Sequence, residues 1–127
     1  MRIALNSNRY ADFCRVDAGT VDTLRAADEI WLPLIVLGEL HAGFAQGSRR
    51  SENEKILARF LGSNRVRVIV PDEQTTHFYA EVCAGLRKAG RPIPTNDLWI
   101  AALVLQHDLV LFARDSHFDH VPRLAKL

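Results

Sequence analysis

Short apolar runs alternate with longer helical patterns along this chain, and that alternation restricts the folds it can adopt. The runs have strand length and are found at Arg2–Leu5, Ile30–Pro33, Val66–Val70 and Leu109–Phe112. Stretches with helical periodicity separate them, which is the order expected of a parallel sheet with helices packed on its faces. We therefore expect an α/β fold with a central parallel sheet.

Helix signals fill the segments between these runs. We expect helices from the end of the first strand to about Phe13, and then over about Gly19–Ala27, Leu34–Phe44, Ser51–Leu61, Asp72–Lys88 and Thr95–His107. Asp72 stands at an N-cap position, and either Thr95 or Asn96 can cap the last helix. Because Leu34–Phe44 is nearly all apolar and too long for a strand, we expect it to be a buried helix.

Length and composition indicate one domain covering residues 1–127. The chain is 48% hydrophobic, which is enough for one core. A net charge of +1 creates no global field, so any affinity for nucleic acid must come from local basic patches. The sequence shows no signal peptide, no apolar run of membrane-spanning length and no metal-binding spacing of its two cysteines, so we expect a cytoplasmic protein without membrane association.

Four polar side chains stand where an apolar element begins, ends or is interrupted: Asn6, Glu39, Asp97 and Asp115. Burying an unpaired carboxylate costs several kcal/mol, so such acids need a partner or a cation. Taken singly they have simpler explanations, because Asp97 can cap a helix, Asp115 can belong to a turn and Glu39 can pair with a core histidine or arginine. Taken together they indicate a metal site.

Two of these residues, Asn6 and Asp115, directly follow predicted strands, and ligands of open α/β sheets bind at that edge. Asp97 in the first turn of one helix and Glu39 within another can point to the same edge. Oxygen ligands without histidine or cysteine favour Mg²⁺ or Mn²⁺ over zinc. A cation held in this way suits phosphodiester hydrolysis.

Four segments carry a resemblance to a known family over nearly the whole chain: Leu5–Asn8, Leu37–Leu40, Pro94–Ala102 and Ala113–Phe118. With them the chain resembles the PIN-domain ribonucleases of the VapC toxin type, which belong to type II toxin–antitoxin systems. The resemblance implies a three-layer α/β/α fold and a Mg²⁺- or Mn²⁺-dependent endoribonuclease acting on transfer or ribosomal RNA. It also implies a VapB-type antitoxin partner and a homodimer.

The resemblance assigns Glu39, Asp97 and Asp115 as catalytic residues that bind the metal together with the residue at position 6. The family has aspartate at that position, whereas this chain has Asn6. An amide oxygen can bind a cation but brings no negative charge and accepts no proton at neutral pH. We therefore expect an attenuated or inactive site, whether the asparagine was introduced or arose naturally.

The alternative is a catalytically dead PIN-like module that binds antitoxin or RNA without cleaving. A phospho-receiver domain also has this length, but it requires adjacent acids after the first strand and a lysine near the last strand. The chain has Asn6-Ser7-Asn8 at the first place and no lysine between Lys88 and Lys126.

Four further residues near the motifs are expected to support the site: Asn8, Thr95, Ser116 and Asp119. Each also has a structural explanation as a cap or turn residue. His117 lies close to Asp115, but a solvent-exposed polar role is favoured for it over a catalytic one.

Overall fold

A parallel sheet of four strands, in the order β3-β2-β1-β4, forms the centre of the molecule. The structure is a computed structural model that describes residues 1–127. The strands are β1 (Arg2–Leu5), β2 (Glu29–Pro33), β3 (Val66–Ile69) and β4 (Val110–Phe112). Every neighbouring pair is parallel, with Ile3 of β1 aligned to Ile30 of β2 and to Val110 of β4. The predicted α/β fold with a central parallel sheet is confirmed.

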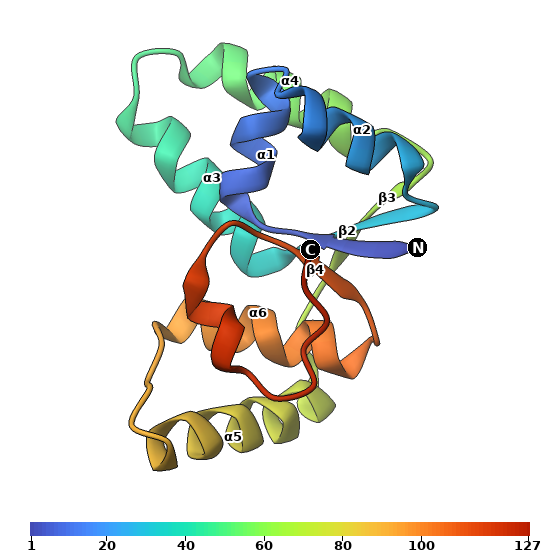
Figure 1. The fold of residues 1–127 in the computed structure, drawn as a ribbon. Coiled ribbons are helices and arrows are strands. Elements are labelled where there is room, and N and C mark those ends of the chain that lie inside the picture. Colours follow the sequence, from blue (N-terminus) through green and yellow to red (C-terminus); the bar gives the residue numbers. More distant parts are fainter.

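Helices cover both faces of this sheet and complete three layers (Figure 1). The helices are α1 (Ser7–Cys14), α2 (Ala18–Ala26), α3 (Leu34–Gln46), α4 (Arg50–Leu61), α5 (Glu73–Lys88) and α6 (Thr95–Gln106), followed by the short 3₁₀ helix η1 (Ser116–His120). Helices α1, α2 and α4 lie on one side of the sheet, and α5 and α6 lie on the other. The three-layer α/β/α arrangement is therefore confirmed.

The central strand β1 is buried because both of its faces are covered. Ile3, Ala4 and Leu5 are each 1% exposed or less. Continuous apolar runs of this kind are typical of parallel strands between two helical layers. The carboxyl end of β1 consequently emerges between the layers, where Asn6 begins α1.

Helix α6 is the most deeply buried helix and completes the core beside the sheet. It lies between the sheet and α5, and seven of its twelve residues are buried. Helix α5 begins with the predicted cap, because the Asp72 carboxylate accepts from the Thr75 N–H and the Thr75 hydroxyl accepts from the Asp72 N–H. The Gln106 side chain at the end of α6 donates to the same carboxylate at 2.9 Å. This bond ties the end of α6 to the start of the helix that covers it.

Two details of the predicted helices are wrong. Helix α3 exists, but it is not a buried helix: only Val36 and Leu40 are buried, and Leu34 is 43% exposed, because no helix covers its outer side as α5 covers that of α6. The predicted cap of α6 by Thr95 or Asn96 is also absent. Pro94 occupies the N-cap position with φ −56°, so both of those residues already lie within the helix.

The chain ends along the free edge of β4. The Leu111 N–H donates to the Ala125 carbonyl, and the Leu127 N–H donates to the Leu111 carbonyl, both at 2.8 Å. This contact covers an edge that would otherwise offer unpaired backbone groups. None of the helices has the length and apolar character needed to cross a bilayer.

Candidate functional site

The predicted site residues lie at the carboxyl edge of the sheet, each supplied by a different element. Asn6 follows β1, and Asp115 lies on the loop after β4. The Asn6 N–H donates to the Phe112 carbonyl at 3.1 Å, which keeps the ends of β1 and β4 side by side. Helix α3 follows β2 directly and carries Glu39, and the first turn of α6 carries Asp97.

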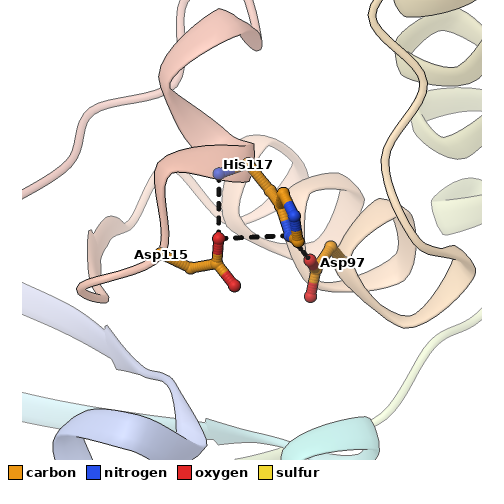
Figure 2. A group of neighbouring side chains, drawn as sticks. All are labelled: Asp97, Asp115 and His117. Atoms are coloured by element: carbon orange, nitrogen blue, oxygen red, sulfur yellow. Dashed lines mark hydrogen bonds and ion pairs between the residues drawn. The ribbon is translucent and has the colours of Figure 1, made fainter.

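Asp97, Asp115 and His117 form a tight group at this edge (Figure 2). The His117 Nδ1 atom lies 2.8 Å from Asp97 Oδ2 and 3.1 Å from Asp115 Oδ1. One ligand atom from each of the three residues lies within 4.8 Å of the other two. The ring nitrogen therefore stands between two carboxylates that come from segments far apart in the sequence.

Local backbone structure places the His117 ring. Asp115 is the N-cap of η1, and its Oδ1 atom accepts from the His117 N–H at 3.0 Å. The next residue, Phe118, is 1% exposed and anchors η1 in the core. On the other side, the Lys126 ammonium donates to the Asp115 carbonyl at 3.0 Å. The loop that carries the acid and the imidazole is thus held at both ends.

Glu39 lies at the same edge but is held by longer contacts. The Ser7 hydroxyl donates to its Oε1 atom at 3.4 Å, and the Asn96 amide donates to its Oε2 atom at 3.5 Å. Burial raises the pKa of Glu39, and the negative charge of Asp97 adds to that rise, while the two hydrogen bonds oppose it. These contacts join Glu39 to α1 and α6, but Glu39 is not one of the residues whose ligand atoms gather within 4.8 Å.

Asp97 experiences the same conflict between charge and burial. The residue is 9% exposed, and burial raises the pKa of its carboxyl group. The contact with His117 opposes this rise, whereas the charge of Asp115 adds to it. For Asp97 and the half-buried Glu39, burial outweighs the hydrogen bonds that favour the charged form, and a cation would stabilise that form.

Asn6 is 5% exposed, and its side-chain amide makes no hydrogen bond within the protein. The amide atoms themselves stay accessible to solvent, unlike the Arg9 Nε and Tyr10 hydroxyl atoms, which are fully buried without a partner. The residue precedes Ser7, which contacts Glu39, so the unpaired amide belongs to the same edge of the sheet. Its oxygen fits a ligand position, although it adds no charge.

Two of the predicted supporting residues border the site. Asn8 neither caps α1 nor contacts an acid, and its side-chain oxygen accepts from the Arg114 N–H at 3.4 Å. Ser116 begins η1 beside Asp115 and is exposed without a hydrogen bond of its hydroxyl. Asn8 therefore contacts the loop that carries Asp115, and Ser116 is open to solvent.

The other two are directed elsewhere. Thr95 is exposed and lines a small pocket together with Tyr79 and Leu86 of α5. Asp119 accepts from the Lys126 ammonium at 2.7 Å, and this hydrogen bond holds the pKa of its carboxyl group below the usual range. In this structure Asp119 stabilises the C-terminal turn.

The sequence favours a solvent-exposed polar role for His117, yet the structure places its ring between the two acids. The available signal is the spacing Asp115-x-His117. An aspartate often accepts from the backbone N–H two residues further on, which bends the chain back over the carboxylate. That geometry is observed here and brings the imidazole of the same residue to the acid.

The residues at this edge suit a divalent cation. Asp97, Asp115 and His117 supply two carboxylates and one nitrogen whose ligand atoms lie within 4.8 Å of one another, while the Glu39 carboxylate and the Asn6 amide offer further oxygens at the same edge, outside that group. The acids come from α3, α6 and the loop after β4, so a shared cation would also join these elements. The donor set therefore fits the metal that the resemblance implies.

Comparison with known proteins agrees with this architecture. The family model described as "PIN domain" matches residues 15–124. The chain is 37% identical to the Ribonuclease VapC1 of Haemophilus influenzae strain R2866, over 80% of this chain and 74% of that protein. It is 28% identical to the Ribonuclease VapC4 of Mycobacterium tuberculosis, over 87% of this chain and 85% of that protein.

Solved structures show the same fold. VapBC-1 from nontypeable Haemophilus influenzae matches with a TM-score of 0.84 and 26% identity, covering 100% of this chain and 97% of that one. VapBC2 from Rickettsia felis, bound to a promoter DNA fragment, has a TM-score of 0.88 and 24% identity, covering 100% and 98%. The chain belongs to the PIN-domain family and, within it, to the VapC group of toxin–antitoxin ribonucleases.

Proposed function

We propose that the chain is a metal-dependent endoribonuclease toxin that hydrolyses RNA phosphodiester bonds and acts as one PIN domain over residues 1–127. The observation that carries this proposal is that the Asp97 and Asp115 carboxylates lie 2.8 and 3.1 Å from one atom, His117 Nδ1. The negative charge of Asp97 also raises the pKa of Glu39. Relatives with the same fold are named ribonucleases, which supports the reaction class.

Glu39, Asp97 and Asp115 would hold Mg²⁺ or Mn²⁺, with the Asn6 amide as a fourth, uncharged ligand. When bound, the cation supplies positive charge that favours deprotonation of an attacking water and stabilises the leaving oxygen. The Ser7 and Asn96 side chains orient Glu39. Catalytic roles therefore fall on the three acids.

The residues around the acids have auxiliary roles in this proposal. Asn8 positions the loop of Asp115 through the Arg114 backbone, and Ser116 is free to contact a phosphate from the start of η1. Thr95 and Asp119 act structurally, in α6 and in the C-terminal turn. Both remain testable by substitution, because neither should alter metal binding.

The proposed partners follow from the relatives. Solved relatives are complexes of a toxin with its antitoxin, which supports a VapB-type antitoxin for this chain. We propose a substrate of the transfer or ribosomal RNA class and therefore a cytoplasmic site of action. Partly exposed apolar side chains of α3, including Leu34, support a homodimer, which light scattering of the purified chain would test.

Asn6 is proposed to attenuate the activity, because the site loses one of four negative charges. The second candidate is a PIN-like module that holds antitoxin or RNA without cleaving it. The unpaired amide of Asn6 at the ligand position is the observation that favours this alternative. Both candidates predict the same fold and differ in the effect of restoring the charge.

The test compares cleavage of single-stranded RNA with added Mn²⁺ by the wild-type chain, Asn6→Asp, and Asn6→Asp combined with Asp97→Asn. The restored carboxylate should raise the rate by about 10-fold or more, and the second substitution should abolish the gain. Asp22→Asn, an exposed acid on α2, is the matched control. No cleavage by Asn6→Asp would favour the binding module.

A further inference from the structure

We propose that His117 binds the divalent cation directly through Nδ1 and makes the site select Mn²⁺ over Mg²⁺. This inference rests on the proposed function, because it concerns the same metal. It goes beyond the set of acids, since it adds a nitrogen ligand and predicts a preference among metals.

The distances match those between neighbouring ligands of one ion. Mn²⁺ and Mg²⁺ hold ligand atoms at about 2.1 Å in an octahedron, so adjacent ligand atoms lie about 3 Å apart. The Nδ1 atom is 2.8 Å from Asp97 Oδ2 and 3.1 Å from Asp115 Oδ1. The nitrogen therefore has the spacing of a neighbouring ligand to each of the two oxygens, which lie within 4.8 Å of each other, and a cation can bind all three after a small shift of the side chains.

The ring is held at this place by its own backbone, which bonds to the same Asp115 oxygen that the ring faces, and by a buried neighbour in η1. Its backbone is fixed by the N–H bond to Asp115 within η1 and by the buried neighbour Phe118. The Nε2 atom has no protein partner, and the side chain is 44% exposed, so water can solvate that nitrogen. When a cation replaces the hydrogen bond on Nδ1, the imidazole keeps its position and its second nitrogen stays satisfied.

A nitrogen ligand changes which divalent cation the site prefers. Mg²⁺ is bound almost only by oxygen, whereas transition metals also accept imidazole nitrogen. With Asn6 in place of a carboxylate, a neutral nitrogen donor adds a bond without adding charge. Compared with a site that has a carboxylate at position 6, a site of three carboxylates, one amide and one imidazole should therefore lose less affinity for Mn²⁺ than for Mg²⁺.

The test measures Mn²⁺ binding to the full chain by electron paramagnetic resonance, including the electron spin echo envelope modulation that a coordinated ¹⁴N nucleus produces. The variants are His117→Gln, His117→Ala and, as a matched control, His120→Gln in the same 3₁₀ helix, where His120 faces Arg91. Competition with Mg²⁺ gives the ratio of the two affinities, and circular dichroism confirms that each variant is folded.

We expect a ¹⁴N coupling in the wild-type chain and in His120→Gln, and its loss in both His117 variants. The preference for Mn²⁺ over Mg²⁺ should fall by about 10-fold when the nitrogen is removed. Mn²⁺ bound without a ¹⁴N coupling would overturn the role of His117 and leave the acidic metal site standing. Absence of Mn²⁺ binding in both the wild-type chain and Asn6→Asp would overturn the metal site itself, and the inference with it.

Discussion

Helices α3 and α6 are both mostly apolar but have very different surroundings. Each is apolar along most of its length and carries one acid, Glu39 in α3 and Asp97 in α6. In α6 the residues from Ile100 to Val104 are each 1% exposed or less, whereas α3 buries only Val36 and Leu40. The cause is α5, which packs over the outer side of α6 and has no counterpart over α3.

The two acids differ in the same way. Asp97 has a 2.8 Å contact with His117, whose other carboxylate neighbour is Asp115. Glu39 has two hydrogen bonds of 3.4 and 3.5 Å, near the limit for such bonds. The covered helix α6 therefore holds Asp97 in a defined position, whereas the less covered helix α3 holds Glu39 only by weak contacts. We infer that a cation would order the α3 side of the site more than the α6 side.

The largest expected effect is on the free energy of unfolding, which should depend on whether a leucine is removed from α6 or from α3. Leu103→Ala in α6 removes a side chain that is fully buried, so the free energy of unfolding should fall by about 2–5 kcal/mol. Leu34→Ala in α3 should change it by less than about 0.5 kcal/mol, because that side chain is 43% exposed. Urea unfolding followed by circular dichroism measures both. Equal losses would show that α3 is covered in solution, for instance by a second subunit.

A second effect concerns the helix that covers α6. Asp72→Ala removes the N-cap of α5 and the bond to Gln106, and it should lower the free energy of unfolding by about 0.5–2 kcal/mol. Glu81→Ala, an exposed position within α5, is the control and should change little. Urea unfolding again gives the values. A neutral Asp72→Ala would mean that packing alone holds α5 on α6.

A third effect tests the electrostatic difference in the metal-free protein. Burial raises the pKa of Asp97, so the folded state favours the protonated acid and loses stability as the pH rises through that raised pKa. At pH 7 in EDTA, Asp97→Asn should therefore have a higher free energy of unfolding than the unsubstituted chain.

The advantage of that variant should shrink as the pH falls toward the ordinary carboxyl pKa of about 4, and it should vanish below that pKa, where Asp97 is protonated in both states. Urea unfolding at pH 7 and pH 4 measures the change. An Asp97→Asn variant less stable than the wild-type chain at pH 7 would show that the contact with His117 outweighs the cost of burial.

Periodicity and cap signals were sufficient to predict the four strands and the helices α1 to α6, but not the 3₁₀ helix η1. Arg2–Leu5 was predicted with the observed bounds, and the Asp72 cap was predicted from its position ahead of an apolar pattern. The edge that gathers the acids could also be predicted, because Asn6 and Asp115 follow two parallel strands. These features depend on local sequence and on the rule that parallel strands end at one edge of a sheet.

The errors concern packing between elements. The apolar sequence of α3 does not say whether another helix covers it, so its exposure required the arrangement in space. The cap of α6 was misassigned because Pro94 can itself occupy the N-cap position ahead of Thr95. His117 was set aside because its proximity to Asp97 joins residues 20 positions apart. Neither helical nor strand periodicity in the sequence predicts the contact between His117 and Asp97.

The smallest expected effect tests how loosely α3 presents Glu39. The hydrogen bonds from Asn96 and Ser7 both lower the pKa of Glu39, and the bond from Asn96 contributes more. Ser7→Ala should therefore raise this pKa, Asn96→Ala should raise it further, and neither should change the unfolding free energy by more than about 0.5 kcal/mol. Titration of the Glu39 carboxyl carbon by nuclear magnetic resonance in EDTA measures both shifts. A fall of this pKa in Ser7→Ala would mean that the hydroxyl does not donate to the carboxylate, and that Glu39 is held from the α6 side alone.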